Sequence, residues 1–150
     1  MEMVNRCWLG MWVVCAASVL VWACTMDKAA LTMDKSALEG ATWRLTQVVH
    51  ADGQLHAVPN SVEATASFAN GSVSGSGGCN RYTTSYTVKD GKLTIGLAAS
   101  TMMACPEPQT AVEQPFMAAL AAAMDYNVED GQLSLLDAGG QKIATFKAWQ

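Results

Sequence analysis

A glycine-rich stretch with one cysteine, GSGGCNRYTTSY at residues 75–86, is the segment whose composition most suggests chemistry. Phosphate binding is disfavoured, because no Gly-Lys-Ser/Thr follows the glycines, their spacing is not GxGxxG, and a strand is expected after them. In a structural corner, Gly77 and Gly78 would adopt backbone angles that other residues avoid. Asn80 would then bond its side chain to nearby backbone. We therefore predict a tight corner of a β-fold.

Cysteine chemistry offers two further possibilities, a nucleophile and a zinc site. The chain has five cysteines, at positions 7, 15, 24, 79 and 105, and two histidines, His50 and His56. A catalytic cysteine needs a histidine base, and these histidines flank an early turn without a triad pattern. Two cysteines and two histidines can bind zinc, but these spacings match no common finger. We expect no enzymatic activity, no metal and no cofactor.

The stretch TMMAC keeps one alternative function open. Met102, Met103 and Cys105 carry soft sulfur atoms, and soft ligands select Cu(I). Methionine is also a common gap-filler in protein cores. A small-ligand or Cu(I)-binding periplasmic module is therefore the alternative to a protein-binding role.

The N-terminus resembles a bacterial secretion signal. Arg6 precedes an uncharged run that extends from residue 7 to residue 24 and is short for a membrane span. The run ends in VWAC, which resembles a lipobox, so we predict a signal peptide at 1–23 and lipidation of Cys24. An uncleaved anchor and a plain signal peptide are the alternatives. Thr25, in place of the aspartate that favours inner-membrane retention, implies an envelope lipoprotein anchored in the outer membrane and facing the periplasm.

A seven-residue unit repeated once, TMDKAALTMDKSAL at 25–38, comes next in the chain. Its residues favour helix and remain solvated, so we predict a lipidated tether over 24–38. If the signal is removed, Cys79 and Cys105 are the remaining pair in an oxidising compartment. We predict a disulfide between them; two buried free thiols are the alternative.

Alternating residues and turn signals predict an antiparallel sheet after Glu39. In TWRLTQVV we expect Trp43, Leu45, Gln47 and Val49 on one face, and in VEATASFA we expect Val62, Ala64, Ala66 and Phe68 to point inward. Hairpin turns are predicted at Asp52-Gly53, Asn70-Gly71, Asp90-Gly91 and Asp130-Gly131.

One helix interrupts these strands. TAVEQPFMAALAAAM begins with Thr110 and Glu113 at capping-box spacing. An apolar face then continues along it, formed by Val112, Phe116, Leu120 and Ala123. Pro115 predicts a kink or a later helix start. The fold class is α+β, a curved and partly barrel-like antiparallel meander with one main helix on its apolar face.

These motifs together resemble the META domain family, which includes HslJ-like heat-shock proteins. The marks are GGCNRY, DGKLTIG, ASTMMAC and GQLSLLDAGGQ, with Gly78-Cys79-Asn80 followed by Thr101, Met103 and Cys105. The likeness covers about residues 38–148, and we assign the domain to 39–150. It implies a stress-related envelope role, a structural Met103 and no catalytic residues. Thr84, where the family often has glycine, and Pro115 depart from the pattern.

The predicted function is therefore a non-catalytic envelope lipoprotein that binds another envelope protein. Arg81 and Tyr82 beside the corner are the first candidates for the partner surface, because arginine and tyrosine are favoured interface anchors. The alternative for Tyr82 is an inward position in an alternating strand. No nucleic-acid partner is expected, since the net charge is −4 and no basic stripe is visible.

Overall fold

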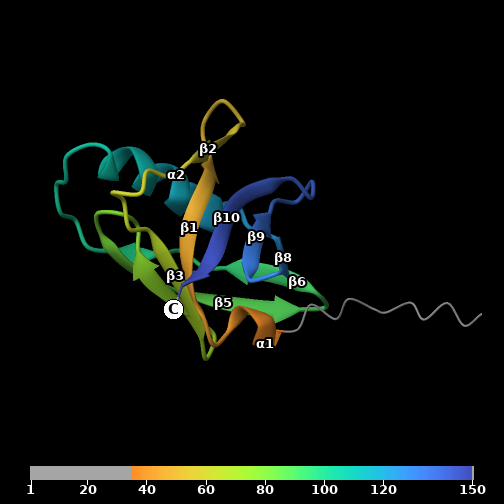
Figure 1. The fold of residues 1–150 in the computed structure, drawn as a ribbon. Coiled ribbons are helices and arrows are strands. Elements are labelled where there is room, and N and C mark those ends of the chain that lie inside the picture. The colour runs from red at the N-terminus through yellow and green to blue at the C-terminus, as the bar shows by residue number, and fades with distance from the viewer. Residues whose placement is uncertain (1–34, 150) are drawn as a thin grey trace, which may run out of the picture. The chain divides into compact units, whose positions relative to one another are not determined.

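The computed structural model describes residues 35–149 (Figure 1). The predicted signal peptide, Cys24 and most of the predicted tether lie outside this range. The helices are α1 (Lys35–Leu38) and α2 (Gln109–Ala122). The strands are β1 (Thr42–Val49), β2 (Leu55–Ala57), β3 (Thr65–Ala69), β4 (Ser72–Ser76), β5 (Arg81–Lys89), β6 (Lys92–Ile95), β7 (Ala99–Ser100), β8 (Asp125–Glu129), β9 (Gln132–Leu136) and β10 (Lys142–Trp149).

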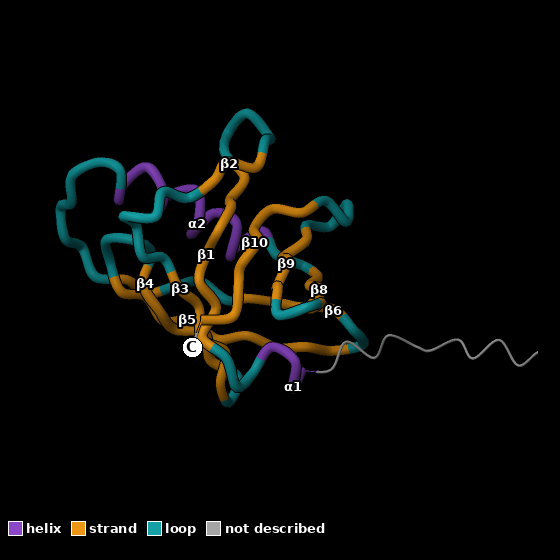
Figure 2. Tube along the Cα trace, viewed as in Figure 1, coloured by secondary structure: helices purple, strands orange, loops and turns teal. Residues whose placement is uncertain are grey.

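The strands form one curved antiparallel sheet, in the order β6-β5-β4-β3-β1-β10-β9-β8 (Figure 2). β1 lies between β3 and β10 and joins two meanders, β3 to β6 and β8 to β10. The sheet does not close, although its ends approach each other where Leu93 N–H donates to the Met124 carbonyl at 3.1 Å. Helix α2 packs on the inner face, where Phe116 contacts Tyr82 and Phe146 edge-on. The predicted α+β class is confirmed.

Three of the predicted two-residue turns are present. At Asn70-Gly71, Asp90-Gly91 and Asp130-Gly131 both residues have positive φ, as a type I′ turn requires. The prediction for Asp52-Gly53 is wrong in detail, because only Gly53 has positive φ. There the hairpin closes with His50 N–H donating to the Gln54 carbonyl at 3.0 Å. This wider loop needs one left-handed residue in place of two.

The predicted alternation of β1 fails halfway along the strand. The register shifts between Leu45 and Gln47, which is a β-bulge. An extra residue reverses the facing of the residues after it, so Val48 is buried and Gln47 is exposed. In β3 and the residues before it, the expected inward side chains are all buried: Val62, Ala64, Ala66 and Phe68.

Helix α2 has the predicted buried face but not the predicted N-terminus. Val112, Phe116 and Leu120 are buried. The helix begins before Thr110 rather than later, and the capping box is absent: the Thr110 hydroxyl donates to the Cys105 carbonyl at 2.8 Å. Pro115 lies inside the helix, where it removes one backbone donor.

The packed domain begins before Glu39. Leu38 is fully buried, and its carbonyl accepts a hydrogen bond from Trp43 Nε1 at 2.9 Å. The Tyr86 hydroxyl donates to Glu39 Oε1 at 2.5 Å and attaches this segment to β5. Leu38, at the end of the predicted tether, thus belongs to the core. Within residues 35–149 no helix is long and apolar enough to cross a bilayer.

Candidate functional site

The glycines of the GSGGCN motif form a corner into which helix α2 and the residues before β3 fit closely. A Cβ on Gly77 would lie 2.9 Å from Glu113 Cγ. Gly78 has a φ of +110°, as predicted, and a Cβ there would lie 2.9 Å from Val62 Cγ1. The same prediction for Gly77 is wrong, because its φ is not positive and glycine is needed there only for space. Larger residues would displace the helix or strain the backbone. These glycines therefore allow a side chain of α2 to approach the main chain.

Asn80 is the centre of a hydrogen-bond network at this corner, and it is only 7% exposed. Its Oδ1 accepts from the Thr101 hydroxyl at 2.9 Å and from Met103 N–H at 2.7 Å. Its Nδ2 donates to Glu113 Oε1 at 2.8 Å. Glu113 Oε2 accepts from the backbone N–H groups of Asn80 at 2.6 Å and Cys79 at 3.1 Å. One amide and one carboxylate thus join the corner, α2 and the loop that leads into α2.

A disulfide adds a covalent link at the same place. Cys79 and Cys105 are bonded to each other, with 5.9 Å between their Cα atoms and a sequence separation of 26. Backbone hydrogen bonding adds a third link, since Thr101 N–H donates to the Arg81 carbonyl at 3.0 Å. The segment from residue 101 to residue 105, which we name the Met loop, is therefore held at both ends.

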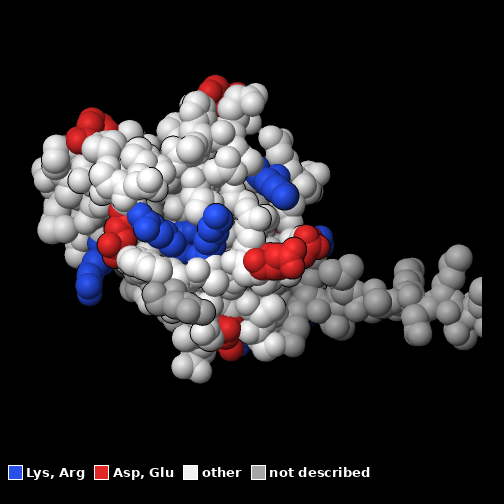
Figure 3. Space-filling view, in the orientation of Figure 1, with Lys and Arg blue, Asp and Glu red and all other residues white. Residues whose placement is uncertain are grey.

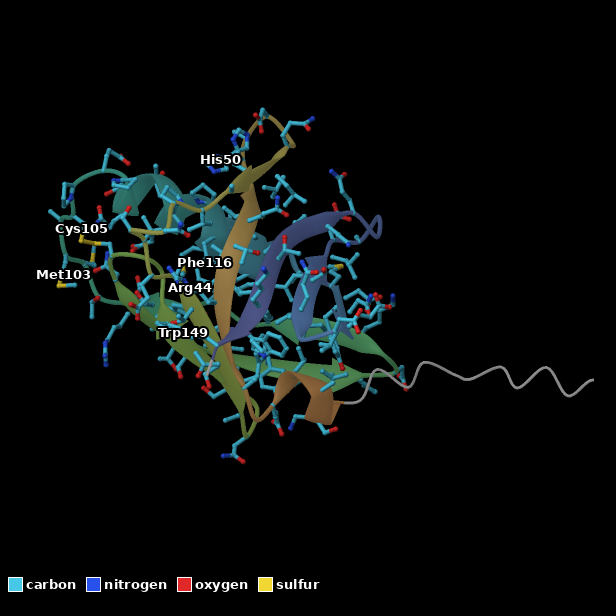
Figure 4. The ribbon with its side chains drawn as sticks, in the orientation of Figure 1. Arg44, His50, Met103, Cys105, Phe116 and Trp149 are labelled. Carbon is cyan, nitrogen blue, oxygen red and sulfur yellow. A yellow bond between two sulfur atoms is a disulfide. The ribbon has the colours of Figure 1, made fainter. Side chains whose placement is uncertain are left out.

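The Met loop exposes apolar side chains although its backbone is fixed (Figure 4). Met102 is 98% exposed and Met103 is 58% exposed. The structural role that the family resemblance implies for Met103 lies in its main chain, whose N–H binds Asn80. The loop borders a pocket of about 530 Å³ that Asn80 and Glu113 also line. Leu97, which precedes β7 in the chain, is 96% exposed.

The two residues predicted to form a partner surface lie on opposite faces of β5. Arg81 is exposed at the start of the strand. Tyr82 is buried: its hydroxyl donates to the Thr65 carbonyl at 3.0 Å, and its ring meets Phe116 edge-on at 5.7 Å. Burial raises the pKa of the Tyr82 hydroxyl above its usual value. The interface role predicted for Tyr82 is therefore wrong, because strand alternation turns it into the core.

The histidines lie in the β1–β2 hairpin. His56 Nε2 is 2.8 Å from Asp52 Oδ2, and the rings of His50 and His56 are 4.4 Å apart. The backbone N–H of Gln54, followed by the His56 side chain, holds the pKa of Asp52 below its usual value. Both histidines thus belong to a local turn.

The described part of the chain contains no group of three or more histidine, cysteine, aspartate or glutamate residues placed to hold a metal. In the oxidised protein Cys105 is bonded to Cys79, so it offers no thiolate to Cu(I). Met102 and Met103 remain as thioether ligands.

Sequence reasoning missed the role of Glu113, which it assigned to a helix cap. The glycine at position 77, where a side chain would overlap Glu113, is the one local sign of this contact. Thr84 also has a role that the family comparison does not suggest. Its hydroxyl donates to the Gly96 carbonyl at 2.8 Å and joins β5 to the segment after β6.

Solved structures with this fold include three proteins. The NMR structure of a protein from Burkholderia xenovorans has a TM-score of 0.64 and 31% identity, covering 77% of this chain and 86% of that one. A second NMR structure of a protein has a TM-score of 0.58 and 25% identity, covering 77% of this chain and 94% of the other. A DUF4847 family protein from Bacteroides vulgatus has 15% identity and a TM-score of 0.53, covering 75% and 95%, and shows the fold alone.

The search of curated proteins gave no match for this chain. The family model that matches is that of the META domain, over residues 36–150. This match begins two residues before Leu38, the first buried residue of the described range, and spans the Asn80 network, the disulfide and the Met loop. The chain therefore belongs to the META domain family.

Proposed function

We propose that this protein is a non-catalytic binding module of the cell envelope, with a stress-related role, and that its Met loop contacts a partner protein. The observation that carries the proposal is the pairing of exposed apolar side chains with a fixed backbone. Met102 and Met103 stand in solvent, while the disulfide and Asn80 hold the residues that bear them. A loop already in its bound conformation loses little entropy on association, which favours affinity.

The residue types of this surface also fit a protein interface. Methionine and arginine are enriched at the cores of such interfaces, and methionine adapts its shape to irregular partners. Arg81 is exposed beside the Met loop, because its backbone pairs with that of Thr101. Arg81, Met102 and Met103 therefore form the proposed partner surface.

The test is co-purification of the full chain with its partners from membranes. Replacing Met102 and Met103 by serine should reduce the captured partner at least about tenfold, since it removes the apolar contact and leaves the fold intact. Met124→Ser is the matched control, because Met124 is also more than half exposed but lies between α2 and β8. Arg81→Ala should weaken capture as well. Equal capture by the serine variant and the wild type would refute the Met loop as the binding surface.

The proposed anchor is a lipid on Cys24 after removal of residues 1–23. Several acyl chains anchor a protein stably, whereas one chain binds only marginally. Intact-mass measurement of the chain isolated from membranes should give an acylated N-terminus at Cys24, and Cys24→Ala should release a soluble or uncleaved form. A mature chain that begins elsewhere or carries no lipid would overturn this part of the proposal without affecting the Met loop.

Copper binding is the second candidate, supported by the exposed thioethers of Met102 and Met103. The purified chain, exposed to Cu(I) and dialysed, would retain metal on this alternative and would lose it in the double serine variant. Retention of less than one copper per chain would leave the protein-binding role as the stronger candidate.

A further inference from the structure

The outer face of the sheet, opposite α2, carries a row of polar side chains that ends in a tryptophan. In an antiparallel pair, residues directly opposite each other project from the same face. The register of five neighbouring strands aligns one such row, made of Thr83, Ser74, Ser67, Thr42 and Trp149. Each hydroxyl can both donate and accept a hydrogen bond. Trp149 is 39% exposed at the end of this row.

The adjacent row contributes positive charge. Arg44 lies directly opposite Lys147, and both project from the outer face. Figure 3 shows Lys and Arg side chains gathered over β1 and β10 at the middle of this face. Like charges directly opposite each other destabilise a sheet, and within residues 35–149 neither side chain pairs with a carboxylate. The uncompensated pair stands out because the whole chain has a net charge of −4.

Arg44 and Trp149 are held in place before any ligand arrives. The Arg44 guanidinium donates to the Asn60 carbonyl at 3.0 Å, and its carbon lies 5.4 Å from the centre of the Trp149 ring (Figure 4). One such bond leaves other N–H groups of the guanidinium for a carboxylate or phosphate oxygen. A stacked and hydrogen-bonded arginine loses less entropy on binding than a free one.

Two hollows lie on this face. One, of about 370 Å³, is lined by Thr42, Ser67 and Ser74 of the hydroxyl row and by two residues of opposite charge, Glu63 and Arg81. The other, of about 280 Å³, is lined by Arg44 and Lys147. Thr42 and Arg44 are two residues apart on β1, so the polar hollow and the charged hollow are neighbours along one strand.

We propose that this outer face binds an acidic oligosaccharide. The hydroxyl row matches the hydroxyl groups of sugar rings, which donate and accept in the same way. The Arg44–Lys147 pair matches a carboxylate or phosphate on the sugar and relieves the repulsion between the two cations. The flat, amphipathic ring of Trp149 offers a surface for the C–H face of a sugar ring. This site shares Arg81 with the proposed partner surface, because Arg81 also lines the hollow of the hydroxyl row, but it includes neither Met102 nor Met103.

The test is calorimetric titration of the full chain, purified in detergent, with tetragalacturonic acid. Galactotetraose, the neutral sugar of the same length, and inorganic phosphate, the anion without a sugar, are the comparison probes. Tetragalacturonic acid should bind at least about tenfold more tightly than either, because only it engages both rows. Its affinity should fall several-fold on raising NaCl from about 0.05 to 0.5 M, since salt screens the cations.

Paired variants assign the site. Arg44→Gln with Lys147→Gln should weaken binding at least about tenfold. The matched control is Lys89→Gln with Lys142→Gln, which removes the same charge from exposed positions elsewhere and should leave affinity unchanged. The double serine variant of the Met loop should also bind normally. If the double variant Arg44→Gln, Lys147→Gln is too unstable to titrate, the single variants Lys147→Gln and Ser74→Val, each at an outward position, are used in its place.

Three results would overturn the proposal. Equal affinity for galactotetraose and tetragalacturonic acid would show that the charged row does not contribute to binding. Phosphate binding as tightly as the acidic sugar would show that the hydroxyl row does not contribute. An equal loss in the Lys89 and Lys142 control would reduce the effect to overall charge.

Discussion

Replacing Glu113 by glutamine tests whether one carboxylate holds the corner of the fold together. Glu113 faces donors only: Oε2 accepts from the backbone N–H groups of Cys79 and Asn80, and Oε1 accepts from Asn80 Nδ2. Glutamine has one acceptor oxygen, and its NH₂ group is a donor. If the oxygen keeps the two backbone contacts, the NH₂ group faces Asn80 Nδ2. The Asn80 amide cannot turn to help, because its Oδ1 already accepts from Thr101 and Met103.

The size of the effect can be worked out from these contacts. Hydrogen bonds to a charged group contribute about 1.5–3 kcal/mol and neutral ones about 0.5–1.5, so the two backbone contacts lose about 2 kcal/mol together. The opposed donors add about 1–2 kcal/mol, reduced by water because Glu113 is only half-buried. We expect Glu113→Gln to lower the free energy of unfolding by about 2–4 kcal/mol. Denaturant titration followed by circular dichroism measures this change, with the slope of the transition unchanged.

The matched control for this substitution is Glu107→Gln. Glu107 is exposed, and its Oε2 accepts a single hydrogen bond, from Ala111 N–H at 3.0 Å. The glutamine oxygen can accept that bond as well, so the change should stay within about 0.5 kcal/mol. A loss at Glu113 no larger than that at Glu107 would refute the carboxylate as the link between the corner and helix α2.

Three further predictions concern the same framework. The Cys79–Cys105 bond closes a loop with a sequence separation of 26, which should stabilise the domain by about 3–4 kcal/mol, so its reduction should lower the melting temperature. Peptide mapping after alkylation without reduction should find neither cysteine labelled. Two labelled thiols would contradict the bond. Gly75→Ala should cost about 2–3 kcal/mol in the same denaturant titration, because its Cβ would overlap the carbonyl oxygen of Thr65 in β3. The Tyr86 hydroxyl holds the pKa of Glu39 below its usual value, so this contribution to stability is present above the unfolded pKa and lost as the pH falls through the folded one. Glu39→Gln should therefore flatten the acid side of the stability–pH curve, and an unchanged curve would contradict the contact.

Features that depend on adjacent residues are predictable from this sequence, and features that depend on distant partners are not. Asn70-Gly71 and Asp90-Gly91 give type I′ turns because both residues of each pair tolerate positive φ. The bulge in β1 has no such local mark. It arises from pairing with β10, about one hundred residues later in the chain, so the predicted facing of Gln47 and Val48 was wrong.

The candidate site was likewise predictable where it depends on adjacent residues and not where it depends on a distant partner. The Gly-Gly-Cys-Asn motif predicted a corner, because glycine permits angles and close contacts that other residues do not. The partner of that corner, Glu113, lies 33 residues from Asn80 and fits a helix-cap pattern equally well by spacing alone. Helix α2 begins earlier than the cap pattern implies, at Gln109. Glu113 therefore lies within the helix, and its side chain contacts the corner instead of capping the helix.

The Asn80 network also explains how the Met loop, which we propose as a partner surface, is kept in position. Asn80 uses its side chain on Thr101, Met103 and Glu113, so little of it remains for a ligand. What it provides is position: the backbone of the Met loop is fixed while Met102 points into solvent. A motif that marks the family can therefore support structure, while the side chains on the loop it holds remain exposed. If the Met loop binds a partner as proposed, changes at Met102 should alter binding without altering stability, and changes at Asn80 should alter both.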